Sequence, residues 1–173
     1  MRFKCGKCAE LHEGVPGFAW DYPTYYLTIP ETERERRCNL TSDTCTVDDK
    51  HFFVRGCLEV PVHDEQDPFV WGVWVSLSAP NFQAFVDVYT QPHRSQVGPF
   101  FGWLQSHIRL YPETCTLKAR VHLRDQGTRP YIELEPTDHP LAIEQREGIT
   151  RTRVIYLFEE MSFPTALDSG SAV

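Results

Sequence analysis

Two apolar stretches near the middle of the chain set the expected architecture. Residues 51–62 alternate with period two, as a strand with two different faces does. One face carries Phe52, Val54, Leu58, Val60 and Val62, and the other carries Phe53, Arg55, Cys57 and Glu59. Residues 69–77 (FVWGVWVSL) are apolar on both faces, which is typical of a central strand that is covered on both sides. The polar loop between these runs favours their antiparallel pairing.

A second pair of alternating segments predicts a β-hairpin. Residues 117–124 and 131–135 flank the turn-forming segment 125–128. The expected outward side chains are Lys118, Arg120, His122 and Arg124 on the first strand and Tyr131, Glu133 and Glu135 on the second. Cross-strand charge pairing is the simpler interpretation of this face, and a stripe that binds an anion or nucleic acid is the alternative.

The remaining periodic segments favour helices. Thr28 and Glu31 form a capping box ahead of a short charged helix that reaches Arg37. Further helices are predicted at 78–89, 100–111, 138–147 and 150–161. Strands in hairpins with helices between them predict an α+β fold, with a mainly antiparallel β-sheet, flanking helices and an N-terminal zinc-knuckle-like segment.

Composition fits one domain and narrows the class of protein. We expect residues 1–163 to form a single α+β domain with the metal knuckle at about 3–48, followed by a flexible tail at 164–173. The chain of 173 residues has no apolar run long enough to cross a membrane and no secretory leader at its start. These features predict a cytoplasmic protein, in which the six cysteines stay reduced.

The charges are unevenly distributed along the chain. With 17 basic and 24 acidic side chains, the net charge is −7. Residues 90–130 carry six basic and two acidic groups, or +4, so the rest of the chain sums to −11. The overall sign makes nucleic acid an unexpected partner and favours a protein partner with a basic surface.

The N-terminal cysteines carry the strongest chemical signal. Cys5-Gly6-Lys7-Cys8 places two thiolates within reach of one ion, and thiolates in this arrangement favour zinc. Two further ligands would complete a tetrahedral shell, and the candidates are His12, Cys38, Cys45 and Cys57. His12 lies in the same irregular segment and Cys45 lies in a turn, so Cys5, Cys8, His12 and Cys45 form the predicted site. A redox C-x-x-C and a pair of ordinary thiols are the alternatives.

Several segments together resemble the bacterial DUF2199 family. They are Cys5-x-x-Cys8 with His12, Leu40-Thr41-Ser42-Asp43-x-Cys45, Phe53-Val54-Arg55-Gly56-x-Leu58-Glu59-Val60-Pro61, Trp71-Gly72-Val73-Trp74-Val75-Ser76-Leu77-Ser78, Arg129-Pro130 and Gly148-Ile149. The resemblance covers about residues 3–160, and the segment 71–78 is the most specific part. The family has no known function, so the resemblance implies the extent of the domain and no activity. It favours Cys45 over Cys38 as a ligand.

These features predict a zinc-binding domain with a structural site, which acts as a binding or interaction protein. A metal-dependent, hydrolase-like enzyme with an open zinc shell is one alternative, and an acidic protein of the immunity or antitoxin type is another. No catalytic residue is predicted, because the chain contains no H-E-x-x-H motif, glycine-rich phosphate loop or nucleophile elbow. Arg55, on a strand face beside Cys57, is a further candidate for binding a ligand.

Overall fold

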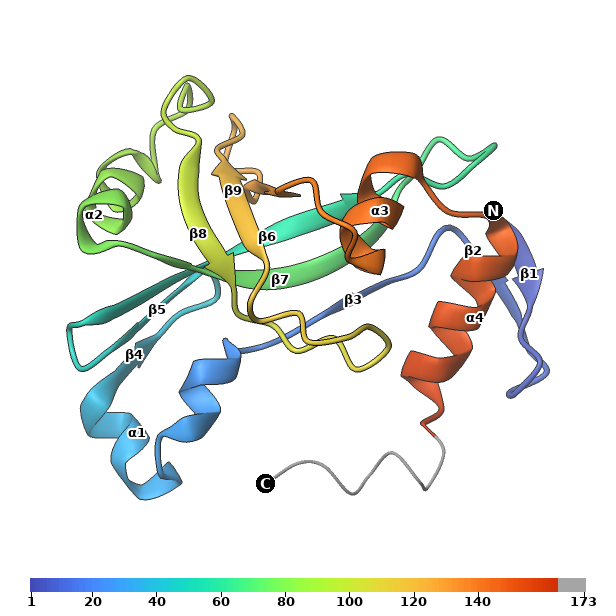
Figure 1. The fold of residues 1–173 in the computed structure, drawn as a ribbon, viewed down its shortest axis with the longest axis horizontal. Coiled ribbons are helices and arrows are strands. Elements are labelled where there is room, and N and C mark those ends of the chain that lie inside the picture. Colours follow the sequence, from blue (N-terminus) through green and yellow to red (C-terminus); the bar gives the residue numbers. More distant parts are fainter. Residues whose placement is uncertain (165–173) are drawn as a thin grey trace.

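A closed five-stranded barrel forms the centre of the molecule. The computed structural model describes residues 1–164 (Figure 1). The barrel strands are β6 (His51–Val60), β7 (Phe69–Leu77), β8 (Phe100–Leu104), β9 (Lys118–His122) and β10 (Tyr131–Leu134). Each strand pairs antiparallel with the next, and β10 closes the barrel by pairing parallel with β6. The closing pair is parallel because five strands of alternating direction leave the first and the last pointing the same way.

The closed barrel shows that the predicted fold class, a mainly antiparallel sheet with flanking helices, is wrong. Both predicted antiparallel strand pairs are present, but the sheet curls until its ends meet. Glycines permit this curvature, because a Cβ at Gly56 would lie 2.5 Å from Ile132 Cδ1 and one at Gly102 would lie 2.2 Å from the Ser76 carbonyl oxygen. Alternation with period two is common to open sheets and barrels, so the pattern could not reveal the closure.

The segment predicted as a helix at 100–111 begins as strand β8 instead. Phe100, Gly102 and Leu104 are buried, whereas Phe101 and Trp103 alternate with them on the outside. Phe101 is 44% exposed and Trp103 is 42% exposed. The helical prediction is wrong because these outward-facing aromatic side chains make the segment apolar throughout and hide its period of two.

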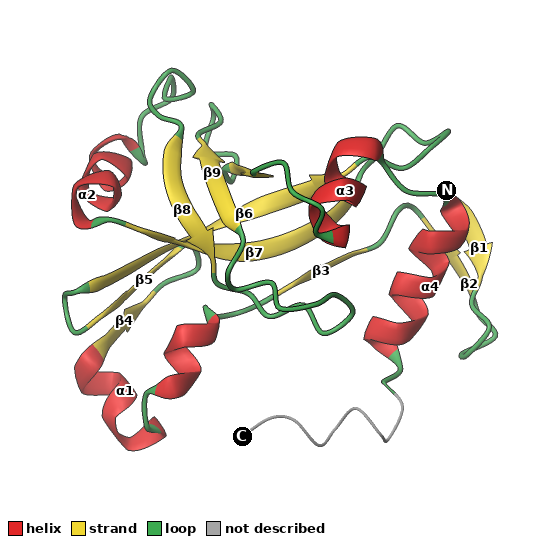
Figure 2. Cartoon of the chain, viewed as in Figure 1, coloured by secondary structure: helices red, strands yellow, loops and turns green. Residues whose placement is uncertain are grey.

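Short strands extend the barrel sheet and form one separate hairpin. β3 (Gly17–Ala19) pairs parallel with β7, β5 (Thr44–Val47) pairs with β6, and β4 (Cys38–Leu40) pairs with β5. β1 (Arg2–Lys4) and β2 (Leu11–Glu13) form a two-stranded sheet of their own (Figure 2). The segment predicted as one knuckle at about 3–48 is therefore divided between this hairpin and the edge of the main sheet.

Four helices and one 3₁₀ turn complete the described part of the chain. They are η1 (Thr24–Thr28), α1 (Glu31–Arg37), α2 (Ala79–Val88), α3 (Pro140–Glu147) and α4 (Arg151–Ser162). The helices predicted at 78–89, 138–147 and 150–161 are confirmed, with Ser78 and Thr150 as N-caps and Gly148 at φ 80° after α3. The capping box is wrong, because the Thr28 hydroxyl donates to the Tyr25 carbonyl and α1 starts after Pro30.

Two groups of buried side chains hold the fold together. The larger includes Val54, Leu58, Trp71, Leu104 and Ile132 from the barrel together with side chains of α2, α3 and α4. The smaller consists of Ile29, Cys45, Val47, Phe53 and Trp74.

No helix among residues 1–164 is long and apolar enough to cross a membrane. The predicted flexible tail, apart from Pro164, lies outside the described residues.

Candidate metal centre

The turn between β1 and β2 holds both cysteines of the C-x-x-C segment. Cys5 N–H donates to the Glu10 carbonyl at 2.9 Å, and Ala9 N–H donates to the Cys5 carbonyl at 3.0 Å. Ala9 has φ 63°, which tightens the return of the chain. The hairpin register then places His12 on β2 beside the turn. Local chain geometry therefore brings the three predicted ligands together.

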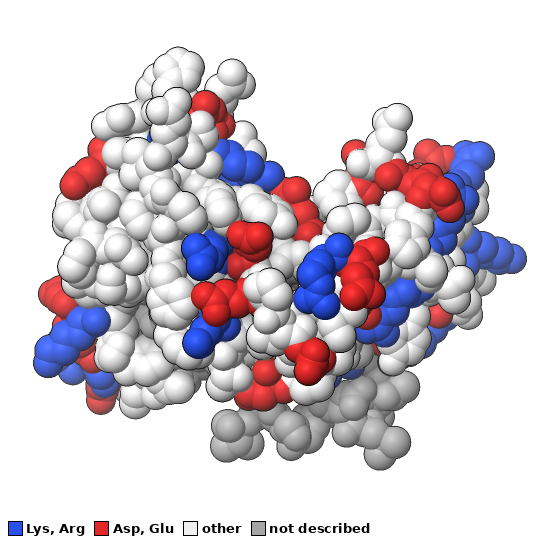
Figure 3. Space-filling view, turned by 45° about the horizontal axis from the view of Figure 1, so that its top comes forward, with Lys and Arg blue, Asp and Glu red and all other residues white. Residues whose placement is uncertain are grey.

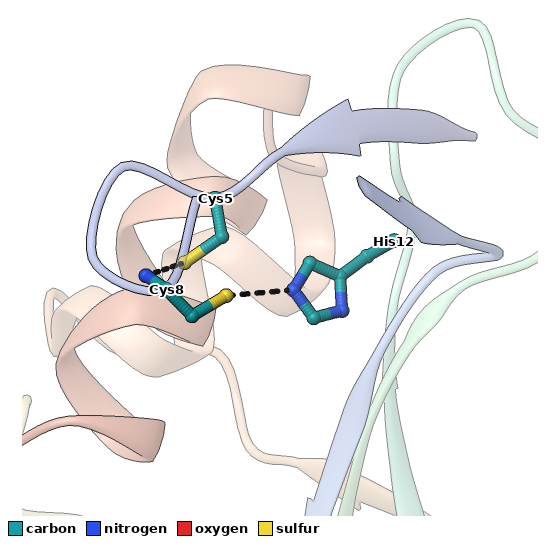
Figure 4. A group of neighbouring side chains, drawn as sticks. All are labelled: Cys5, Cys8 and His12. Atoms are coloured by element: carbon teal, nitrogen blue, oxygen red, sulfur yellow. Dashed lines mark hydrogen bonds between the residues drawn. The ribbon is translucent and has the colours of Figure 1, made fainter. Parts of the chain in front are cut away.

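The side chains of Cys5, Cys8 and His12 point toward a common centre (Figure 4). Their ligand atoms all lie within 4.8 Å of one another, and Cys8 Sγ lies 3.3 Å from His12 Nε2. Tetrahedral zinc with bonds of about 2.0–2.3 Å separates its ligands by roughly 3.3–3.8 Å. Two sulfurs and one imidazole nitrogen at this spacing can hold a metal ion after small side-chain movements.

Local polar groups act on the two sulfur atoms. Cys8 N–H donates to Cys5 Sγ at 3.4 Å. The Glu10 backbone N–H favours the Cys8 thiolate, but partial burial and the neighbouring Cys5 thiol outweigh it and raise the pKa of Cys8. A bound divalent cation would reverse this balance, because it stabilises thiolates directly.

Helix α4 supports the hairpin from one side. The Phe158 ring lies 5.4 Å from the Phe3 ring and 4.6 Å from the His12 ring, measured between centroids. Phe3 itself stacks on His12 at 5.3 Å. The three rings thus form a triangular cluster in which the imidazole packs against both phenyl rings, and this packing restricts its orientation toward the cysteines.

Charged side chains of α4 hold the turn itself. Gly6 N–H donates to Glu159 Oε1 at 2.5 Å, and Lys7 Nζ donates to Glu160 Oε1 at 2.8 Å. A Cβ at Gly6 would lie 3.0 Å from Glu159 Oε1, so a larger residue there would make this carboxylate shift. Sequence reasoning missed these supports, because about 150 residues separate the turn from α4 and no local pattern links them.

Cys45, the fourth predicted ligand, is not brought to this group. It lies on β5 opposite Phe53 and is fully buried in the smaller apolar cluster. Burial raises the pKa of the Cys45 thiol to about 12. The signal for a strand was present in the sequence, since Cys45 and Val47 alternate with Thr44 and Thr46, and both are buried. Among the described residues, only Cys5, Cys8 and His12 form a group suited to a metal ion.

Acidic and basic side chains are interspersed over the face of the molecule seen in Figure 3. Many opposite charges of the described chain form pairs, such as Arg153 with Glu144 and Arg124 with Glu59. The uneven distribution of charge along the sequence therefore does not become a single large acidic or basic region on this face. The expected partner with a basic surface stays a prediction.

Comparison with known proteins places the chain in one family. No curated protein and no solved structure matches it. A family model described as "Uncharacterized protein conserved in bacteria (DUF2199)" matches residues 4–149. This range includes the C-x-x-C turn, His12 and all five barrel strands, and it ends before α4. The chain is therefore a member of the DUF2199 family.

Proposed function

We propose that Cys5, Cys8 and His12 bind one zinc ion with a structural role, in a protein that acts by binding a partner. The convergence of the three ligand atoms within 4.8 Å carries this proposal. Two thiolates and one imidazole favour zinc over magnesium or calcium, which prefer oxygen ligands. When bound, the ion would supply bonds that join the turn to β2.

The size of the hairpin supports a structural role. Its strands have three residues each, and an isolated two-stranded sheet of this length is marginally stable in water. Cys5 is buried, while Cys8 and His12 are half-buried against α4. A ligand that binds only the folded state stabilises it by about 2.7 kcal/mol at a hundredfold excess over its dissociation constant. Zinc at this position would therefore keep the hairpin docked on the helix.

Metal analysis of purified protein and three variants tests the proposal. We expect one zinc per chain in the wild type and in Cys45→Ala, and loss of zinc from Cys8→Ser and His12→Ala. Chelation should lower the melting temperature of the wild type and of Cys45→Ala, but not that of Cys8→Ser. Protein that retains no metal when purified without chelator contradicts the site. Zinc loss from Cys45→Ala would instead restore Cys45 as a ligand.

A metal-dependent hydrolase is the second candidate, favoured by the three-ligand set. Zinc with three protein ligands can keep a water molecule in its fourth position, as catalytic zinc sites do. Zinc-dependent hydrolysis of a simple ester such as 4-nitrophenyl acetate, absent from the folded His12→Ala variant, would support the enzyme. Hydrolysis that is unchanged by this substitution or by chelation would exclude the site as its source.

A further inference from the structure

Exposed aromatic and basic side chains meet on the outer surface of β8 and β9. The Phe101 and Trp103 rings form an edge-to-face pair with centroids 5.8 Å apart. In the antiparallel register, Arg120 lies opposite Phe101 and Lys118 lies opposite Trp103. Lys118 Nζ is 5.8 Å from the centroid of the Trp103 ring. Large aromatic side chains on an outer strand face contribute nothing to the barrel core, so their exposure calls for another explanation.

The basic side chains on the outer face of β9 differ in how closely carboxylates approach them. His122 Nε2 lies 2.8 Å from Glu133 Oε2, which is an instance of the cross-strand pairing expected for this face. Arg120 is 54% exposed, and its ion pair with Glu135 has a distance of 4.0 Å. Among residues 1–164, no carboxylate lies within 4.0 Å of Lys118 Nζ. Lys118 is thus available to an external anion, and the exposed Arg120 can exchange its long contact with Glu135 for one.

Beside the exposed aromatic pair, the surface has a depression over β7 and β6. It has a volume of about 270 Å³. Its lining residues are Tyr25, Lys50, His51, Phe52, Phe53, Ser76, Leu77 and Gln105. Ser76 lies directly opposite Trp103 in the sheet register, so the depression borders the aromatic pair. No acidic side chain lines it, although the chain as a whole is acidic.

The depression contains a second aromatic surface. The Tyr25 and His51 rings have centroids 4.5 Å apart, and Tyr25 Oη lies 3.1 Å from His51 Nε2. The Phe53 ring lies 5.8 Å from the Tyr25 ring. We define the outer aromatic face as Tyr25, Lys50, His51, Phe101, Trp103, Lys118 and Arg120. Rings and cations lie together at each of its two ends, with Lys50 next to His51 at one and Lys118 and Arg120 opposite Trp103 and Phe101 at the other.

We infer that the outer aromatic face binds single-stranded nucleic acid. Exposed rings stack on unpaired bases of any sequence, and neighbouring lysine and arginine side chains contact the phosphates. The net charge of −7 disfavours the duplex, whose affinity comes largely from neutralising many phosphates. Few cations combined with several rings therefore favour a single strand, in which stacking supplies much of the affinity.

Fluorescence anisotropy of labelled dT15 and rU15 with the purified 173-residue protein tests this inference. We expect saturable binding at low salt, and weakening of about tenfold or more in Phe101→Ala/Trp103→Ala. Lys118→Glu/Arg120→Glu should also weaken binding and flatten its salt dependence. Three phosphate contacts, with Lys50 as the third, predict a wild-type slope of about −2 in log K against log salt. The two probes distinguish DNA from RNA as the source of the strand.

A matched control separates the loss of base stacking on this face from the loss of any exposed aromatic ring. Tyr156→Ala removes a ring that is 48% exposed on α4, and it should leave binding unchanged. Each variant should keep the wild-type circular dichroism spectrum, because the substituted side chains lie outside the core. Absence of binding to both probes, equal binding by Phe101→Ala/Trp103→Ala, or equal competition by polyglutamate would each overturn the inference.

Discussion

The N-terminal hairpin and the barrel are held together in different ways. The barrel encloses a continuous apolar core, to which each of its five strands contributes buried side chains. The hairpin has two three-residue strands and depends on the aromatic and polar contacts of α4. A large core stabilises its region without a ligand, whereas a small hairpin needs additional bonds. A bound metal ion would therefore change structure in residues 1–13 and not in the barrel.

Removing a barrel side chain should have the largest effect on stability. Leu58 is fully buried in the larger cluster, and Leu58→Ala should cost about 2–5 kcal/mol because it leaves a cavity in a closed structure. Urea unfolding measures this loss, with Leu27→Ala, a change at a 51% exposed side chain, as the control. Zinc stoichiometry should stay unchanged in the folded variant. Loss of zinc together with an intact barrel would contradict the independence of the two regions.

A polar support of the hairpin should have an intermediate effect. Glu159→Ala removes the acceptor for the Gly6 N–H, so the C-x-x-C turn is less well ordered before metal binds. We expect zinc affinity to fall about tenfold, as it does when the groups that orient metal ligands are removed. Competition with a chelating dye measures this change. Glu160→Ala, which affects only the exposed Lys7 pair, should change the affinity much less.

The smallest expected effect concerns the loop between β4 and β5 and its dependence on pH. Burial raises the pKa of the Asp43 carboxyl, but hydrogen bonds from Ser42 and Arg129 outweigh burial and hold this pKa below its ordinary value. Its contribution to stability is therefore complete above the unfolded pKa of about 3.9 and disappears as the pH falls through the lower folded value.

The Asp43 contribution can be isolated by comparing unfolding at several pH values. The stability difference between wild type and Asp43→Asn should be below about 1 kcal/mol at pH 7, because Arg129 is 40% exposed, and it should shrink toward pH 3. Arg129→Leu completes a double-mutant cycle. A difference that grows as the pH falls would contradict the assigned pair.

Local patterns predicted the elements whose contacts are close in sequence. The 51–60 and 69–77 strands alternate or stay apolar over their whole length, and Ser78, Thr150 and Gly148 mark helix ends through bonds or φ angles within a few residues. Prediction failed at β8, where Phe101 and Trp103 are exposed. The sequence does not distinguish an aromatic residue that is exposed from one that is buried, because exposure depends on the fold.

The sequence by itself determined strands β6, β7, β9 and β10, all four helices and the grouping of Cys5 and Cys8 with His12, because turns and short spacings act within one stretch of chain. Tertiary structure alone decided the closure of the barrel, the burial of Cys45 away from the hairpin, the support from α4 and the outer aromatic face. Each of these depends on contacts between distant segments. Such contacts form when the whole core packs, and no local pattern specifies them.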